Sequence, residues 1–253
     1  IKRPNGILLI TGPTGSGKTT TLYATLNELN KTGTKIITAE DPVEYTVAGI
    51  NQSEANEKIG LTFPAILRTM LRQDPNVIMV GEIRDAETAD IAIAAALTGH
   101  LVLSTLHTND APSTITRLIN MGAKPFLVAT SLQGILAQRL VRRICKQCKV
   151  QVVYTADQLR EMGFDAEALK GIPFYKGKGC KECNNIGHRG RIGIYELIDM
   201  NETLRDMTYH TASTDDIRKV ARTSGMTTLK EDGLRKAKDG KTTLEEVFMV
   251  SGV

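Results

Sequence analysis

Short apolar runs alternate with amphipathic segments over the first 140 residues of the chain. Four of these runs, at residues 7–10, 35–38, 77–80 and 101–105, predict buried strands. The segments between them repeat apolar residues three or four positions apart, which is the spacing of a helix with one buried face. Continuous runs of valine, isoleucine and leucine that alternate with helices are typical of a parallel sheet covered on both faces. We therefore predict an α/β core.

Two segments between the predicted strands show clear features of a helix. After the first strand, Leu22, Leu26 and Leu29 share one helical face. Residues 86–97 form an alanine-rich segment with Asp85 in the position of an N-cap. Both segments are long enough to cover a sheet.

The character of the chain changes near residue 140. Residues 139–149 are basic and contain a Cys-x-x-Cys pair, and the glycine-rich residues 177–193 contain a second pair. Capping-box patterns that begin at Thr155, Thr228 and Thr243 predict short helices. The predicted domains are a core over 1–140, a cysteine-containing subdomain over 141–192 and a helical subdomain over 193–253.

Composition and charge exclude several classes of protein. Hydrophobic residues make up 41% of the chain and charged residues 24%, which are ordinary values for a protein with a buried core. The 32 basic and 28 acidic side chains give a net charge of +4, too mild to require a nucleic acid or a membrane as partner. Apolar runs fall far short of the ~20 residues of a membrane span, and no secretory signal opens the chain. Membrane-spanning, disordered and disulfide-scaffold classes are excluded.

Residues 12–19 match the phosphate-loop pattern G-x-x-x-x-G-K-[ST] at each required position. A predicted strand precedes them and a predicted helix follows, which is the context this motif needs. Glycines let backbone N–H groups turn toward an anion, and the helix N-terminus adds its positive end. We expect Lys18 to face the β- and γ-phosphates of a nucleotide and Thr19 to hold Mg²⁺. The predicted nucleotide-binding residues are Gly12, Pro13, Thr14, Gly15, Ser16, Gly17, Lys18, Thr19 and Thr20.

Two further apolar runs end in acidic residues. The run at 77–80 leads through a glycine to Glu82, and a carboxylate at such a strand end holds the Mg²⁺ shell in phosphate-loop proteins. The run that begins at residue 35 leads to Glu40, Asp41 and Glu44. Hydrolysis requires a base that orients and deprotonates water, and a carboxylate suits this role. Spacing alone does not show which of the three acids is the base.

His100 and His107 stand at the two ends of the strand predicted at 101–105. A single histidine is usually a structural residue, and a separation of seven positions along one strand does not place both on one site. The residues alone assign neither histidine a role.

Two Cys-x-x-Cys pairs, Cys145 with Cys148 and Cys180 with Cys183, are separated by 31 residues (180 − 148 − 1). This spacing is typical of a tetrahedral zinc site with four thiolate ligands. Disulfides are less favoured because the given sequence contains no export signal. His188 lies nearby, but four thiolates already complete the shell. We predict a structural Zn²⁺ site.

Four segments together resemble the signature boxes of the secretion ATPases, the motors of type II secretion and type IV pilus machines. They are the phosphate loop, Thr-Ala-Glu-Asp-Pro-Val-Glu (aspartate box), Val-Gly-Glu-Ile-Arg-Asp (Walker B box) and Gly-His-Leu-Val-Leu-Ser-Thr-Leu-His-Thr (histidine box). The resemblance covers residues 6–140 and implies a RecA-like core that hydrolyses ATP. It implies that Glu44 is the catalytic base, that Glu82 takes the Walker B position, and that His100 and His107 respond to the phosphates. It assigns no role to Arg84.

The resemblance also implies partners and location. The four cysteines resemble a motif of the pilus-extension and secretion-type members of the family. The pilus-retraction ATPases of the same family lack this motif. The resemblance implies a cytoplasmic homo-hexamer, peripheral to the inner membrane, that uses ATP, Mg²⁺ and Zn²⁺ and drives an inner-membrane platform protein, without binding nucleic acid or inserting into the membrane. In this family a preceding domain supplies arginines to the neighbouring site. Because the first strand begins six residues from Ile1, we expect this chain to be the C-terminal part of a longer protein.

Two other functions are weighed against this one. RecA-like cores also serve nucleic-acid translocases, and a basic run beside the cysteines could form a nucleic-acid patch. That run consists of Arg139, Arg142, Arg143, Lys146 and Lys149. The modest net charge and the 4% aromatic content disfavour this alternative. A regulatory module that binds nucleotide without turnover is disfavoured by the two acids Glu44 and Glu82.

Overall fold

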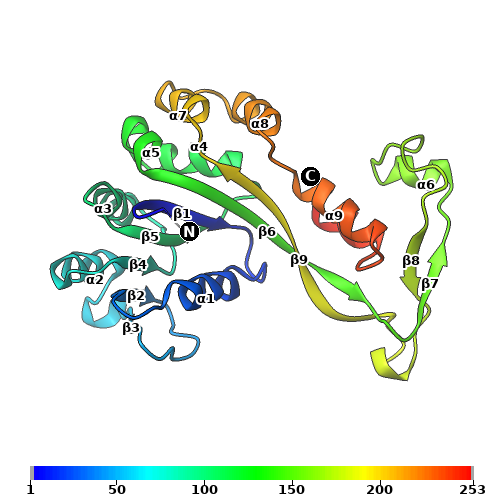
Figure 1. Ribbon diagram of the computed structural model, residues 1–253, viewed down its shortest axis with the longest axis horizontal. Coiled ribbons are helices and arrows are strands. Elements are labelled where there is room, and N and C mark those ends of the chain that lie inside the picture. Colours follow the sequence, from blue (N-terminus) through cyan, green and yellow to red (C-terminus); the bar gives the residue numbers. More distant parts are fainter. Residues whose placement is uncertain (1–2, 252–253) are drawn as a thin grey trace. The chain divides into compact units, whose positions relative to one another are not determined.

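The computed structural model describes residues 3–251 as an α/β protein (Figure 1). The strands are β1 (Gly6–Thr11), β2 (Ile36–Glu40), β3 (Asn51–Glu54), β4 (Val77–Val80), β5 (Leu101–Leu106), β6 (Leu132–Ile144), β7 (Lys149–Val152), β8 (Phe174–Gly177) and β9 (His188–Asp199). Among the described residues, seven of them form one sheet in the order β3-β2-β4-β5-β1-β6-β9. Neighbours from β3 to β6 run parallel, whereas β7 and β8 form a separate antiparallel pair.

The α-helices are α1 (Lys18–Leu29), α2 (Phe63–Met70), α3 (Ala86–Leu97), α4 (Pro112–Asn120), α5 (Pro125–Ser131), α6 (Ala156–Glu161), α7 (Glu202–Tyr209), α8 (Thr214–Thr223), α9 (Leu229–Lys238) and α10 (Leu244–Ser251). Short 3-10 helices are η1 (Glu57–Ile59), η2 (Leu71–Gln73) and η3 (Lys181–Cys183). Over residues 3–251, no helix is both long enough and apolar enough to cross a bilayer.

Contacts divide the chain into two compact units. Unit 1 comprises the residues up to Ala137 together with Leu197–Met226, and unit 2 comprises Gln138–Glu196 together with the residues from Thr227 onward. This division differs from the sequence-based expectation of a single helical subdomain over 193–253. The reason is that the last four helices bury their apolar faces in different cores: α7 and α8 in unit 1, α9 and α10 in unit 2.

Unit 1 is a sheet with helices on both faces. Strands β2, β4 and β5 are buried along their whole length, as their continuous apolar runs predict. Helix α1 covers one face through Leu22, Tyr23 and Leu26. Helices α2, α3, α4 and α5 pack against the other face, and α7 and α8 extend the same core by packing onto α5 and α4 (Figure 1). The predicted α/β fold is confirmed.

Local capping explains where several helices begin. Asp85 accepts a hydrogen bond from Thr88 N at the start of α3, as predicted. Thr155 and Thr228 each complete a capping box at α6 and α9. At α10, Thr243 accepts from the backbone N–H of Glu246 at 3.3 Å, but the Glu246 carboxylate binds Arg142 instead of closing the box.

Candidate nucleotide site and cysteine cluster

The predicted phosphate loop connects the end of β1 to the start of α1. Gly15 and Gly17 have φ values of 78° and 87°, in the left-handed region where a side chain would strain the backbone. Lys18 is the first residue of α1. Its ammonium group turns back over the loop and donates to the carbonyl oxygens of Gly12 at 2.8 Å and Pro13 at 3.1 Å. The lysine and the loop backbone therefore form one compact unit.

The loop is open on its outer side. A Cβ built on Gly15 would meet no atom within 4 Å. Pro13 and Thr14 are exposed, and so are Thr19 and Thr20 in the first turn of α1. This open, glycine-rich turn lies at a helix N-terminus, with Lys18 and the exposed hydroxyl of Thr19 beside it. Such an arrangement fits a phosphate group and its metal ion.

Glu82 follows β4 at the carboxyl edge of the sheet, the edge that also carries the phosphate loop. One carboxylate oxygen lies 3.1 Å from Nε2 of His107, which follows β5. The other accepts a hydrogen bond of 2.8 Å from Nε of Arg84, and that bond raises the pKa of the guanidinium. Arg84 also reaches Oδ2 of Asp41 at 3.4 Å. The structure thus brings residues of the Walker B, histidine and aspartate boxes together.

Hydroxyl groups inside the apolar strands hold the backbone around these side chains. Thr105 donates to the carbonyl oxygen of Gly81 at 2.7 Å, directly before Glu82, and Ser104 donates to Val80 at 2.8 Å. Both hydroxyls are buried in β5, where the sequence showed two polar residues within an otherwise apolar run. These two polar residues in an apolar strand were the sequence signal that their hydroxyls bind the backbone of β4 and the residue after it.

Thr11 performs the same task for His107. Its hydroxyl donates to the carbonyl oxygen of Leu106 at 3.0 Å and accepts from the backbone N–H of Thr108 at 3.0 Å. The two residues that flank His107 are therefore fixed to the last residue of β1, next to the phosphate loop. Sequence reasoning missed this residue because its partner lies 97 positions away.

The three acids of the aspartate box lie in different environments. Glu40 is buried, 3% exposed, and accepts hydrogen bonds from the hydroxyls of Tyr23 and Thr38. Asp41 is exposed and paired with Arg84. Glu44 is also exposed, and its carboxylate makes no hydrogen bond or ion pair with any residue of the described chain. Of the three, Glu44 is the carboxylate that is free to meet water.

His100 lies away from this group of residues. It precedes β5, at the amino edge of the sheet, where its Nδ1 lies 2.9 Å from the carbonyl oxygen of Ala95 and 3.2 Å from Oγ1 of Thr98. A strand advances ~3.3 Å per residue, so seven positions separate His100 from His107 by about 23 Å. Within the described chain, His107 lies beside Glu82 and His100 lies at the opposite edge of the sheet, and the response of either histidine to the phosphates stays a prediction.

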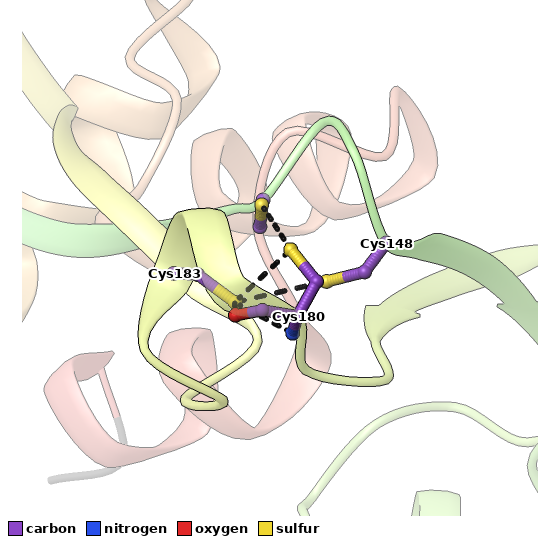
Figure 2. A group of neighbouring side chains, drawn as sticks. Cys148, Cys180 and Cys183 are labelled. Atoms are coloured by element: carbon purple, nitrogen blue, oxygen red, sulfur yellow. Dashed lines mark hydrogen bonds between the residues drawn. The ribbon is translucent and has the colours of Figure 1, made fainter.

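The four cysteines of unit 2 bring their sulfur atoms together. All four Sγ atoms lie within 4.8 Å of one another, and three pairs are separated by 3.7–3.8 Å. Figure 2 shows the sulfurs of Cys148, Cys180 and Cys183 turned toward one another. Zinc–thiolate bonds of ~2.3 Å in a tetrahedron place the sulfurs about 3.8 Å apart, so the cluster fits Zn²⁺.

Backbone N–H groups favour the thiolate form of one of the four cysteines, Cys183, whereas burial raises the pKa of Cys148 and Cys180. Burial opposes ionisation of the Cys183 thiol, but N–H groups of Cys180 at 3.3 Å and Gly187 at 3.2 Å outweigh it and lower its pKa to about 7. A Cβ on Gly177 would lie 2.0 Å from the carbonyl oxygen of Gly187, so only glycine permits this close approach. The glycine-rich sequence around the second cysteine pair follows from that packing.

A glycine-rich turn between a central parallel strand and its following helix, with a carboxylate at a neighbouring strand end, defines the class of phosphate-loop nucleotide-binding proteins. The chain belongs to the family described as "Type II/IV secretion system protein", whose family model matches residues 1–249. The resemblance drawn from the four boxes is thereby confirmed.

Individual relatives support the same family. The type IV pilus assembly ATPase PilB of Myxococcus xanthus is 54% identical over 98% of this chain and 44% of its own length. The type II secretion system protein E of Pseudomonas aeruginosa is 50% identical over 99% of this chain and 49% of its own length. The chain thus spans about half the length of these relatives. The crystal structure of the pilus retraction motor PilT with bound ADP matches with a TM-score of 0.72 and 31% identity, over 99% of this chain and 62% of that one.

Proposed function

We propose that this chain is the catalytic part of an ATPase that powers type IV pilus assembly or type II secretion. One observation carries the proposal: the phosphate loop, Glu82, His107 and the exposed Glu44 all follow strands of one parallel sheet at its carboxyl edge. Ligands of open α/β sheets bind at that edge. The names of the relatives, a pilus assembly ATPase and a type II secretion protein, support the same activity.

The proposed roles follow from chemistry and position. Lys18 and the loop N–H groups bind the β- and γ-phosphates of ATP, and the Thr19 hydroxyl and Glu82 hold the Mg²⁺ shell. When bound, Mg²⁺ neutralises charge on the phosphates and thereby eases their transfer. His107, whose Nε2 lies 3.1 Å from a carboxylate oxygen of Glu82, is within reach of the same shell and responds to its occupancy.

We assign the base that activates water to Glu44. The carboxylate of Glu40 is buried and engaged by hydroxyl donors, and the carboxylate of Asp41 is paired with Arg84. A general base needs an accessible carboxylate that is not held by a cation. Glu44 meets that condition, which supports the assignment that the family resemblance implies.

The quaternary and cellular parts of the proposal rest on the family alone. The protein works as a homo-hexamer at the cytoplasmic face of the inner membrane, where it passes its motion to a platform protein. The proposed domains are an ATPase core over 1–140, a zinc subdomain over 141–192 and helices over 193–253. The two compact units divide this last segment differently. Cys145, Cys148, Cys180 and Cys183 hold one structural Zn²⁺.

No observation favours the nucleic-acid alternative. Two members of the basic run already have partners within unit 2: Arg142 binds Glu246 at 2.6–2.9 Å, and the Lys149 ammonium lies 4.2 Å from the centre of the Tyr175 ring.

Steady-state phosphate release from ATP by the full-length protein, with and without single- or double-stranded DNA, tests the proposal. We expect Mg²⁺-dependent turnover that DNA leaves unchanged. Turnover that appears only with DNA, or DNA binding that weakens steeply with salt, would favour the translocase.

A further inference from the structure

Tyr23 joins the helix of the phosphate loop to the segment that carries Glu44. It lies on α1, five residues after Lys18, and its side chain is 1% exposed. Its hydroxyl donates to Oε2 of Glu40. The phenol oxygen of Tyr23 itself accepts a hydrogen bond of 3.3 Å from the backbone N–H of Glu44 and another of 3.3 Å from Nε2 of Gln52. One phenol thus bonds to three segments: β2, the loop after it, and β3.

Further bonds hold the rest of this loop at its backbone. Gln52 accepts from the N–H of Val47 at 2.7 Å and donates to the carbonyl oxygen of Tyr45 at 3.2 Å. The ring of Tyr45 packs on the ring of Tyr23, with 4.5 Å between centroids. The backbone on both sides of Glu44 is therefore fixed while its carboxylate stays exposed.

The hydroxyl is suited to a permanent structural bond. Burial, together with the hydrogen bond to Glu40, raises the pKa of Tyr23 to about 12. The phenol consequently keeps its proton across the physiological range and continues to donate to Glu40. Its oxygen lone pairs remain for the N–H of Glu44 and the amide of Gln52. The Tyr23 hydroxyl can therefore donate to Glu40 and accept from Glu44 and Gln52 at the same time.

We propose that Tyr23 is a positioning residue for the hydrolytic base: its hydroxyl sets the place of Glu44 relative to the phosphate loop on the same helix. This inference rests on the proposed function, because it takes Glu44 as the base. Since α1 begins with Lys18, any shift of the phosphate-loop helix is passed through Tyr23 to Glu44. Misplacement of a catalytic group by ~1 Å can cost ~10²-fold in rate.

Tyr23→Phe in the full-length protein tests the proposal, because it keeps the ring packing and removes only the hydroxyl. We expect kcat for ATP to fall about tenfold with KM and nucleotide affinity unchanged. Tyr154→Phe is the matched control, because it removes a phenol bond to Glu245 (2.8 Å) in unit 2. That variant should leave kcat unchanged. Equal kcat in Tyr23→Phe and wild type would overturn the proposal.

A double-mutant cycle with Glu44→Gln separates this inference from the proposed function. If Tyr23 acts through Glu44, adding Tyr23→Phe to Glu44→Gln lowers kcat no further. A full additional tenfold fall would show that Tyr23 acts by another route and would overturn the inference. Undiminished turnover in Glu44→Gln alone would instead refute the base assignment and, with it, the proposal.

Hydrogen exchange of the unaltered protein gives a readout that does not depend on activity or on the folding of a variant. The Glu44 amide is expected to be protected, although its residue is exposed, because it donates to Tyr23. In Tyr23→Phe this amide should exchange faster, while the Val47 amide, held by Gln52, keeps its rate. Exchange of the wild-type Glu44 amide at the rate of an open loop would contradict the proposal.

Discussion

At the scale of single residues, the cation over the phosphate loop has the most direct consequence. Lys18→Ala removes the charge that would face the β- and γ-phosphates in a site crowded with negative charge. We expect loss of tight ATP binding, measured by calorimetric titration. Lys31→Ala is the matched control, because Lys31 is exposed beyond the end of α1 and should bind ATP as the wild type does. ATP affinity of Lys18→Ala equal to that of the control would rule out the proposed phosphate contact.

Glu44→Gln should separate binding from chemistry. The amide keeps the shape of the side chain but cannot accept the proton of water, so turnover should fall by ~10²-fold or more with ATP affinity retained. Single-turnover hydrolysis by the full-length protein measures both steps. Glu28→Gln, an exposed position on α1, should hydrolyse ATP at the wild-type rate. A normal rate in Glu44→Gln would move the base to another residue.

The sequence predicted some of these residues and missed others for a physical reason. Lys18 and Glu82 belong to contiguous motifs, so their places could be predicted from strand ends. Tyr23 and Gln52 could not, because their roles depend on partners that only the fold brings near. The three acids after β2 are indistinguishable by spacing, whereas burial of Glu40 separates it at once from Glu44.

At the scale of elements, the cysteine cluster connects the loop after β6 with η3. We expect one Zn²⁺ per chain by elemental analysis of protein purified without chelator, because thiolates in a tetrahedron favour zinc over harder cations. Cys180→Ser should loosen residues 145–190 in hydrogen exchange and leave the phosphate loop, which belongs to the other unit, protected. Protein without stoichiometric zinc, or exchange unaltered around the cluster, would contradict the site.

Helix α9 is tied to β9 by a buried carboxylate with a predictable pH response. Burial alone would raise the pKa of Asp232, but hydrogen bonds from Lys236, the N–H of Tyr195 and Arg235 lower it below its ordinary value. A lowered pKa stabilises the fold at pH above the unfolded value of ~3.9, and this stabilisation is lost as the pH falls through the folded value.

Asp232→Asn should therefore lower the free energy of unfolding of unit 2 by about 2 kcal/mol at pH 7. The difference from wild type should shrink below about pH 4. Urea unfolding, followed through the exchange of β9 and α9 amides, measures it. Asp239→Asn, which removes an exposed pair with Lys241, should change little at either pH. An Asp232→Asn effect that is the same at pH 7 and pH 3 would show that the charge is not its source.

Strands β3 and β6, which sequence reasoning missed, both lack the alternation of apolar and polar residues that predicts a strand. Strand β3 reads Asn-Gln-Ser-Glu and offers no apolar pattern, so only pairing with β2 defines it. Strand β6 buries Leu132, Ile135, Val141 and Ile144, at the spacing of a helix face. A register irregularity where β6 pairs with the start of β1 breaks the alternation that a strand normally shows.

At the scale of the whole molecule, the candidate nucleotide site and the cysteine cluster belong to different compact units. The nucleotide-site residues, including the loop from Asp41 to Val47, belong to unit 1, and the four cysteines belong to unit 2. Because β6 and β9 each contribute to both units, the boundary falls inside strands. Composition changes near residue 140, inside β6, but does not mark the second boundary inside β9, and this is why the last helices could not be divided between the units from sequence alone.

The central claim is that the residues at the carboxyl edge of the unit 1 sheet hydrolyse ATP. Phosphate release from saturating ATP by the full-length protein, measured with Mg²⁺ and with a chelator of Mg²⁺, tests it most directly. We predict multiple turnovers that require Mg²⁺ and disappear in Lys18→Ala. Tight binding of Mg²⁺·ATP without any phosphate release would contradict the account and would make the chain a nucleotide-binding module that does not hydrolyse.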